Sequence, residues 1–443
     1  MRYDVMIIGG GPGGYTAANK AGRNGLKTIL FEKDQIGGTC LNRGCIPMKA
    51  LIQSAHVYKD AKQGEMFGVL AENTSLDYGK VKERRDSVVS TLRGGIEKSL
   101  KANKVETVKG FAQIIDKDKI SCNGEIYEGD HIIIAAGSIP AIPPIEGREF
   151  AITSDDVLEK DHQLKDSIII IGGGVIGCEI ADAFSGFGVK VTVIEMADRL
   201  LPTLDRELGT RLAMFFRKKG IDVICSAAVK KIGEDHSVTY TDKKGEEQTV
   251  TADEVLIATG RRANIASLVS EDFSLETGRG IVSDENGRTN VDSIYVIGDA
   301  RQGNIQLAHV AEAQGENIID LILGRQPSHD MSVIPSGVYT DPEIASVGIG
   351  EDELKEKGIA YQARKYLTGA NGKCLIENSD SGFVKIITVD DVIVGGQIIT
   401  PHATELIGEL TVAVQKKLKV SELSEVVHPH PTISEMIWDA VKE

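Results

Sequence analysis

Two stretches of the chain share one pattern of apolar and polar positions. Each opens with a short apolar run, 5–8 in the first copy and 168–171 in the second, which predicts a strand buried on both faces. A glycine-rich turn follows, and behind it comes a predicted helix. A second apolar run then ends in an acid, Glu32 in the first copy and Glu195 in the second. Because every feature recurs 163 positions later, the chain contains two copies of one strand–turn–helix–strand unit.

The turn of each copy has the spacing Gly-x-Gly-x-x-Gly: Gly9, Gly11 and Gly14, then Gly172, Gly174 and Gly177. In dinucleotide-binding units the first glycine makes the tight turn, the second lets the backbone approach a pyrophosphate, and the third lets the helix pack on the strand. The pyrophosphate meets free N–H groups at the positive end of the helix, and the acid accepts hydrogen bonds from a ribose. A single copy is weak support, since glycine-rich turns without a ligand are common. Two copies in the same context predict two dinucleotides in two separate domains.

Further apolar runs complete the two units and then give way to a different pattern. Runs at 130–137, 253–260 and 293–299 predict more buried parallel strands, and the polar stretch 234–248 predicts an exposed hairpin or loop. From about Ile334 the runs 382–389 and 392–399 indicate alternating strands, followed by an apolar helix over about 403–417. This last part carries no dinucleotide fingerprint. The predicted fold class is therefore α/β, with two Rossmann-like dinucleotide-binding domains and a C-terminal α+β domain.

The composition limits the function further. The 443 residues carry a formal net charge of −15 without a basic run, which argues against a nucleic-acid partner. The chain has no run of about 18 apolar residues, and its opening Met-Arg-Tyr-Asp does not resemble a signal peptide. Six cysteines are few for this length and exclude a disulfide-stapled secreted scaffold. We expect a cytoplasmic, multidomain protein with no membrane or nucleic-acid partner.

One close pair of cysteines, Cys40 and Cys45, follows directly on the first dinucleotide unit. Pro47 fits the first turn of the next helix, which places Cys45 at a helix N-terminus whose partial positive charge favours a thiolate. Cys40 lies five residues earlier, close enough for a loop to fold back and form a reversible disulfide. A zinc site needs more ligands at short spacing, and two buried thiols do not need the glycines around this pair. Redox chemistry is therefore the favoured interpretation, and no metal site is expected.

The segment Gly-Gly-Thr-Cys-Leu-Asn-Arg-Gly-Cys-Ile-Pro-Met-Lys at 37–49, flanked by two dinucleotide fingerprints, resembles the pyridine nucleotide-disulfide oxidoreductases. The resemblance covers essentially all 443 residues and is closest to the members that oxidise dihydrolipoyl groups with NAD+. We therefore expect an FAD-binding domain in two parts, 1–139 and 262–328, an NAD-binding domain at 140–261 and a dimerisation domain at 329–443.

The same resemblance implies where the cofactors FAD and NAD bind. The first fingerprint with Glu32 would hold FAD, and the second with Glu195 would hold NAD; the latter acid and Gly177 also favour NAD over NADP. The remaining cofactor residues implied are Thr39, Lys49, Ala112 at the FAD adenosine, Gly137, Asp299 at the ribityl chain, Ala308 and His309 in a helix start beneath the flavin ring, and Val229 and Gly260 around the NAD adenosine. Lys49 and Glu179 would form an ion pair close to the flavin N5 and the nicotinamide, where the lysine places positive charge against the reduced flavin anion.

A histidine segment, Val427-His-Pro-His-Pro-Thr-Ile-Ser-Glu435, lies near the C-terminal end. Histidine exchanges protons near neutral pH, as thiol–disulfide exchange requires, and Glu435 can orient the imidazole and stabilise its cation. A lone histidine is usually structural. The segment resembles the catalytic base of the family, which makes His430 rather than His428 the main candidate. The resemblance further implies a homodimer in which His430 completes the partner subunit's site.

The implied reaction is a two-stage relay of electrons. A dihydrolipoyl group, on a carrier protein or as free lipoamide, is oxidised by the Cys40–Cys45 disulfide, with Cys40 as the exchanging thiol and His430 taking its proton. Cys45 passes the electrons to FAD, and the reduced flavin gives hydride to NAD+.

Other interpretations stay open beside this one. An NADH-dependent reductase of another small disulfide would use the same machinery, and a noncatalytic FAD-binding partner in a larger assembly belongs to a different class. Mercuric reductase is discounted, because it would need an extra cysteine pair at the C-terminus and the last cysteine here is Cys374. Two positions depart from the family pattern: Met48 stands where serine or threonine is usual, and Ala263 where proline is usual. Both are expected near cofactor edges.

Overall fold

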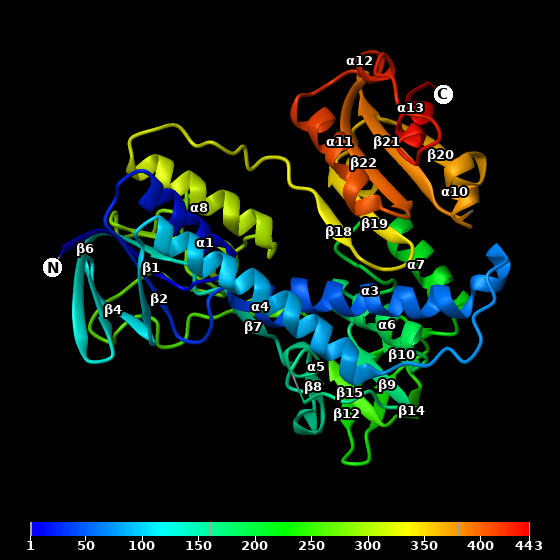
Figure 1. The fold of residues 1–443 in the computed structure, drawn as a ribbon, viewed down its shortest axis with the longest axis horizontal. Coiled ribbons are helices and arrows are strands. Elements are labelled where there is room, and N and C mark those ends of the chain that lie inside the picture. The colour runs from blue at the N-terminus through cyan, green and yellow to red at the C-terminus, as the bar shows by residue number, and fades with distance from the viewer. Residues whose placement is uncertain (1, 160, 380, 443) are drawn as a thin grey trace.

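The protein forms three structural units in a computed structural model that describes residues 2–159, 161–379 and 381–442. In Figure 1 the first unit lies to the left, the second below and to the right, and the C-terminal unit above the second. Two long helices, α3 (Cys45–Lys62) and α4 (Tyr78–Ala102), run from the first unit across to the second. No helix among these residues is long and apolar enough to cross a membrane.

The first unit contains a seven-stranded sheet. Its parallel strands are β3 (Glu106–Lys109), β2 (Thr28–Glu32), β1 (Arg2–Ile8), β6 (Glu125–Ile134) and β17 (Ile294–Val296), in that order. The hairpin of β4 (Ala112–Asp116) and β5 (Lys119–Cys122) joins the N-terminal part of β6 in antiparallel register.

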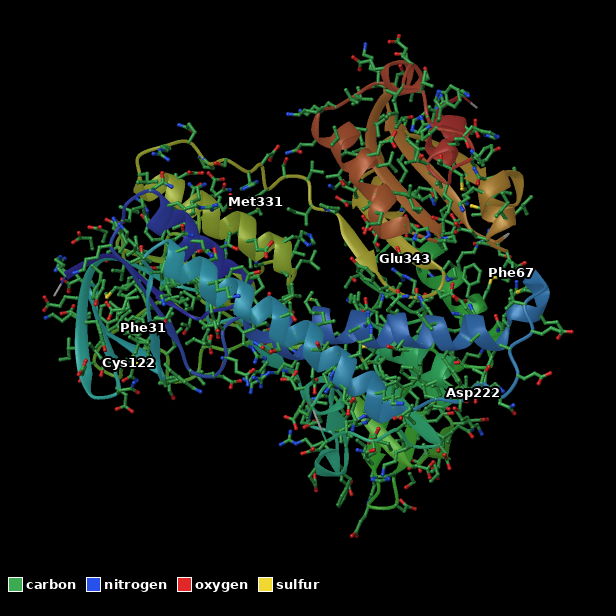
Figure 2. All side chains as sticks on the ribbon, viewed as in Figure 1. Phe31, Phe67, Cys122, Asp222, Met331 and Glu343 are labelled. Atoms are coloured by element: carbon green, nitrogen blue, oxygen red, sulfur yellow. The ribbon has the colours of Figure 1, made fainter. Side chains whose placement is uncertain are left out.

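Both faces of this sheet are buried, as the apolar runs predict. Helices α1 (Pro12–Arg23) and α8 (Ala308–Ile322) pack side by side over one face, where they share a core with Val5 and Ile7. Met6 and Ile8 point the other way, into a core with the β4–β5 hairpin. Figure 2 shows Phe31 and Cys122 within this unit. Successive side chains of a strand point to opposite faces of the sheet. A strand buried on both faces therefore needs an uninterrupted run of apolar residues.

The second unit has a five-stranded, all-parallel sheet in the order β11-β10-β9-β15-β8. Its strands are β8 (Ile152–Thr153), β9 (Ser167–Ile171), β10 (Lys190–Ile194), β11 (Asp222–Ile224) and β15 (Glu254–Ile257), with helices α5 (Ser154–Val157), α6 (Val175–Phe187) and α7 (Arg206–Lys218). An antiparallel meander of β12 (Ala228–Ile232), β13 (Ser237–Thr241) and β14 (Glu247–Thr251) contains the predicted exposed hairpin. After α4 the chain crosses twice more between the first two units, and these crossings pair as strands β7 (Ser138–Pro140) and β16 (Arg261–Ala263).

The third unit is an antiparallel sheet with helices, reached by an extended segment after α8 that passes Met331. The strand order is β18-β19-β22-β21-β20. The strands are β18 (Ser336–Val338), β19 (Glu343–Gly348), β20 (Gln362–Leu367), β21 (Phe383–Val389) and β22 (Val392–Thr400), and the helices are α9 (Glu351–Glu356), α10 (Gly372–Ile376), α11 (Ala403–Gln415), α12 (Val420–Ser424) and α13 (Glu435–Lys442). The predicted fold class is thus confirmed.

One hydrophobic core connects all three units. It contains Leu51 of α3, Phe184 of α6 and Phe383 of β21, each of which is almost fully buried. Burial of side chains this large favours a fixed arrangement of the units, because separating them would expose the apolar surface to water.

Candidate active site

A continuous cavity of about 1870 Å³ runs between the three units. This exceeds the roughly 300–1,000 Å³ of a site for one drug-sized ligand, so it has room for more than one extended molecule. The predicted residues that line it are Gly9, Gly11, Glu32, Thr39, Cys40, Cys45, Lys49, Ala112, Gly137, Gly172, Gly174, Glu179, Glu195, Val229, Gly260, Asp299, Ala308 and His309.

The six fingerprint glycines have three distinct surroundings. Gly9 and Gly172 have positive φ angles of 106° and 114°, and a Cβ on either would collide with a backbone carbonyl. A Cβ on Gly14 would lie 1.8 Å from the oxygen of Gly9, and the equivalent distance from Gly177 to Gly172 is 2.0 Å. These four glycines therefore shape the turn and let the helix approach the strand, as the pattern predicts.

The middle glycines face open space instead. Gly11 and Gly174 are the N-cap residues of α1 and α6, and neither helix start is capped by a side chain. A Cβ on Gly11 would meet nothing closer than Gly38 Cα at 3.8 Å, and one on Gly174 would meet nothing within 4 Å. Each helix thus presents unpaired N–H groups to the cavity, where a phosphate can approach the backbone.

Glu32 and Glu195 occupy equivalent positions beside the two turns. One oxygen of Glu32 accepts the amide of Gly10 at 2.7 Å and the other accepts that of Asp34 at 2.8 Å. Glu195 accepts two backbone amides in the same way, each at 2.6 Å. These bonds orient both carboxylates and leave each oxygen a lone pair for a ribose hydroxyl. Burial raises the pKa of Glu32.

Cys40 and Cys45 lie next to each other, on two consecutive helices. Cys45 is the first residue of α3, as predicted, whereas Cys40 belongs to a short helix, α2 (Gly38–Arg43), rather than to a loop. Both are free thiols, and the Cys40 thiol donates a hydrogen bond to Cys45.

This geometry makes the two thiols unequal. The hydrogen bond from Cys40 and the positive charge of Lys49 lower the pKa of Cys45 to about 7. The same hydrogen bond, burial and the negative charge of Glu312 raise the pKa of Cys40 well above its ordinary value. Cys45 is consequently the more acidic of the two thiols.

Lys49 and Glu179 form the predicted ion pair across two units. Lys49 Nζ lies 2.8 Å from Oε2 and 3.0 Å from Oε1 of Glu179. The Glu179 side chain is only 4% exposed, so the pair lies in a weakly screened environment. Burial lowers the pKa of Lys49, but the charge and hydrogen bond of Glu179 outweigh this effect and raise it overall. Lys49 is therefore a permanent cation beside Cys45.

Asp299 and the start of α8 also line the cavity. Asp299 accepts a hydrogen bond of 2.5 Å from Ser138, whose hydroxyl in turn accepts one from Arg261 at 2.8 Å. Ala308 is the first residue of α8, and His309 Nε2 lies 3.0 Å from the carbonyl oxygen of Pro335. Met48 lines the cavity. Ala263, paired with Ser138 between β16 and β7, is not among the lining residues described.

His430 and Glu435 pair with each other but do not line this cavity. His430 Nδ1 lies 2.9 Å from Glu435 Oε1, and Glu435 also accepts the amide of Thr432 at 2.9 Å. The hydrogen bond from Thr432 and the contact with His430 lower the pKa of Glu435. The His430 side chain is 81% exposed. His428, by contrast, is buried against Trp438 and bonded to Glu409 at 2.9 Å, which leaves it a structural role.

Comparison with known proteins identifies the family. Residues 3–315 match the pyridine nucleotide-disulphide oxidoreductases, and residues 334–441 match the dimerisation domain of that family. The chain belongs to the pyridine nucleotide-disulphide oxidoreductase family.

Relatives within the family resemble the chain over nearly its whole length. It is 40% identical to a dihydrolipoyl dehydrogenase of Bacillus subtilis, with 99% of this chain and 97% of the relative covered. Identity to the dihydrolipoyl dehydrogenase of Geobacillus stearothermophilus is 38%, over 99% and 95%. Among solved structures, the flavoprotein disulfide reductase RclA of Escherichia coli has a TM-score of 0.88 at 27% identity, with 99% of each chain covered. LpdA of Mycobacterium tuberculosis has the same TM-score, identity and coverage.

Pyridine nucleotide-disulphide oxidoreductases of this kind use FAD and NAD(H), and the residues present fit both. Two helix starts open onto one cavity at Gly11 and Gly174, each with an oriented acid beside it. Cys40 and Cys45 line the same cavity as the first helix start. Glu179 belongs to α6, the helix that begins at the second helix start.

Two tyrosines of this oxidoreductase site were not predicted from the sequence. Tyr339, after β18, contacts both members of the Lys49–Glu179 pair. Tyr15 donates a hydrogen bond of 3.0 Å to Glu312 near the cysteines, and burial and that carboxylate raise the pKa of Tyr15. Neither tyrosine belongs to a spacing motif with its partner. Only the proximity of Tyr15 to the first fingerprint could have drawn attention to it.

Proposed function

We propose that this chain is a dihydrolipoyl dehydrogenase: a cytoplasmic homodimer that oxidises a dihydrolipoyl group, on a carrier protein or as free lipoamide, and reduces NAD+. The observation that carries the proposal is the pair of unequal thiols, Cys40 and Cys45, in a cavity that also holds two dinucleotide cradles. The identity of 40% to a dihydrolipoyl dehydrogenase across almost the whole chain supports the substrate.

The first stage is an exchange of a dithiol for a disulfide. A thiolate of the dihydrolipoyl group attacks Cys40 of the Cys40–Cys45 disulfide, and the electron pair of the broken S–S bond stays on Cys45. The second thiol of the substrate then attacks the mixed disulfide and releases Cys40, so the substrate leaves as a cyclic disulfide and the enzyme keeps two electrons. The positive charge of Lys49 suits Cys45 as the leaving sulfur, because it stabilises the thiolate that forms, and the Cys40 thiol adds its hydrogen bond once it has been released.

The second stage carries the electrons to the nicotinamide. Bound FAD supplies the carrier between the thiolate and NAD+, which accepts a hydride. Lys49 holds a positive charge beside Cys45, where negative charge accumulates during this stage, and Glu179 fixes the direction of the ammonium.

The proton of the exchange requires a base, and we assign this role to His430, acting on the partner subunit's cysteines. Glu435 holds the imidazole through Nδ1, which leaves Nε2 to accept a proton from a thiol. The exposure of His430 and its position away from the cavity of its own chain support a role in trans.

We also propose which part of the chain carries each role. We assign FAD binding to residues 1–139 and 262–328, NAD binding to 140–261 and dimerisation to 329–443. The β7–β16 ribbon, where the chain passes twice between the first two sheets, supports the first two boundaries.

Steady-state turnover with a panel of disulfides tests the proposal. We expect NADH-linked reduction of lipoamide with a kcat/KM at least roughly a hundredfold above that for glutathione disulfide, a difference of about 2.7 kcal/mol. The alternative is an NADH-dependent reductase of another small disulfide, which has support in the structural similarity to RclA. Greater activity with a different disulfide, and little with lipoamide, would replace the proposed substrate by that one.

A further inference from the structure

The Lys49–Glu179 pair has a third member, which comes from the C-terminal unit. The amide of Tyr339 donates a hydrogen bond of 3.0 Å to Glu179 Oε1, one of the two oxygens that Lys49 contacts. The ring of Tyr339 lies beneath the lysine, with Nζ 4.5 Å from the ring centroid. One residue thus touches the carboxylate through its backbone and the ammonium through its side chain.

Two acidic side chains of α6 accept backbone amides of the segment that carries Tyr339. Glu179 accepts the amide of Tyr339, and Asp182, one turn along the same helix, accepts the amide of Asp341 at 2.8 Å. Asp182 also binds Lys219 at 2.6 Å, and its side chain is 3% exposed. The Asp341 carboxylate is paired with Lys59 and with Lys219.

These two amide bonds join the segment between β18 and β19 to α6 on either side of residue 340, so they fix the position of the backbone at Tyr339. From this backbone position the side chain places its ring against Lys49, with Nζ 4.5 Å from the ring centroid. Three units meet here, since Lys49 lies in the first turns of α3, Glu179 lies in α6, and Tyr339 follows β18.

The two partners of Lys49 act on it differently. Glu179 neutralises the ammonium as well as holding it, and a neutralised pair contributes little field at a distance. An aromatic face attracts a cation through its quadrupole but carries no net charge. A lysine shared between the two is held in place while less of its charge is cancelled.

We propose that Tyr339 is a positioning residue that holds the Lys49 ammonium toward the cysteine cavity through its ring face. The inference rests on the proposed function, because it assumes that negative charge develops beside Lys49 during turnover. Loss of the ring removes one of the contacts that hold the ammonium in place, so it can shift with Glu179 away from that charge.

Two substitutions at Tyr339 separate the ring from the rest of the side chain. Tyr339→Phe keeps the ring face and the backbone amide, and Tyr339→Leu removes the face. We expect kcat for dihydrolipoamide to stay within about twofold in the first and to fall about tenfold in the second, with KM within twofold in both. The midpoint potential of the bound flavin, measured by equilibration with a redox dye, should become more negative only in Tyr339→Leu.

A matched control is available on α3. The ring of Tyr58 lies 4.5 Å from Lys62 Nζ, the same distance as in the Tyr339 contact, and Tyr58 does not line the cavity. Tyr58→Leu should leave kcat and the flavin potential unchanged. Wild-type behaviour of Tyr339→Leu, or equal losses in the Phe and Leu variants, would overturn the inference.

Fluorinated phenylalanines at position 339 test the same point if Tyr339→Leu does not fold or does not retain FAD. Each added fluorine weakens the quadrupole with little change of shape, so kcat should fall stepwise along the series, and a flat series would refute the role of the ring. Failure of the wild-type enzyme to oxidise dihydrolipoamide would refute the substrate instead. The flavin potentials of the Phe and Leu variants would still decide the role of Tyr339.

Discussion

Lys49 binds both carboxylate oxygens of Glu179, at 2.8 and 3.0 Å, across the boundary between the first two units. Both charges also act on Cys45, in opposite directions. The positive charge of Lys49 lowers the pKa of the Cys45 thiol and the negative charge of Glu179 raises it, while the larger effect comes from the Cys40 hydrogen bond. The ion pair therefore adjusts a thiolate whose main stabilisation comes from its cysteine partner.

Substitutions in this pair should shift the pKa of Cys45 with opposite signs. Lys49→Met removes the charge that favours the thiolate, so the pKa should rise by about one unit, which corresponds to about 1.4 kcal/mol. Glu179→Gln removes the opposing charge, so the pKa should fall. The measurement is the rate of Cys45 alkylation by iodoacetamide in reduced apoenzyme as a function of pH, followed by mass spectrometry. Shifts of the same sign in the two variants would contradict the electrostatic argument.

The open space at Gly174 predicts a binding defect without a folding defect. A methyl group there meets no protein atom within 4 Å, but it would stand where the backbone approaches the pyrophosphate of NAD. Gly174→Ala should raise KM for NAD+ at least roughly tenfold, about 1.4 kcal/mol, and leave the Tm nearly unchanged. Gly177→Ala is the contrasting variant, since its methyl group would lie 2.0 Å from the oxygen of Gly172 and should lower the Tm. Unaltered NAD+ kinetics in Gly174→Ala would show that the pyrophosphate binds elsewhere.

The position of the Glu195 carboxylate predicts a preference for NAD(H) over NADP(H). Its carboxylate is fixed by two backbone amides at the cavity edge, where it would repel the 2′-phosphate of NADP. We expect kcat/KM for NAD(H) to exceed that for NADP(H) by at least roughly tenfold, or about 1.4 kcal/mol. Equal values in parallel assays with the two cofactors would remove Glu195 from the ribose site.

Local patterns were sufficient to predict the parts of the site that depend on neighbours in the chain. The glycine turns, their acids and the position of Cys45 at a helix start each follow from a few consecutive residues. The pairing of His430 with Glu435 likewise spans only five positions. Motifs of this kind specify backbone geometry directly, which is why they can be recognised in a sequence.

Contacts between distant segments could not be predicted in this way. Tyr339 follows Glu179 by 160 positions, and nothing in the segment after β18 indicates that its amide reaches α6. His309 was expected beneath a flavin ring from resemblance alone, and its bond to the Pro335 carbonyl depends on how the C-terminal unit packs against α8. Cys40 was expected in a loop, because a six-residue helix that begins at a pair of glycines gives almost no periodic signal.

A mixed dimer tests the proposed role of His430 in trans. Cys40→Ser and His430→Ala homodimers should both be nearly inactive, because every site lacks one essential group. In a mixed dimer one site carries both substitutions, and the other combines Cys40 of one chain with His430 of its partner. Refolding the two variants together with FAD should restore up to half of the wild-type activity per mixed dimer. No recovery in mixed dimers, confirmed by different affinity tags, would show that each chain uses its own histidine.

The unequal roles of the two thiols are the central claim, and absorption spectra of two oxidised variants test it most directly. In Cys40→Ser the remaining Cys45 has no disulfide partner, and the serine hydroxyl can still donate a hydrogen bond to its thiolate. A thiolate against the oxidised flavin should give a long-wavelength charge-transfer band, which we expect in Cys40→Ser and not in Cys45→Ser. The reverse result, a band in Cys45→Ser alone, would contradict the account and exchange the roles of the two cysteines.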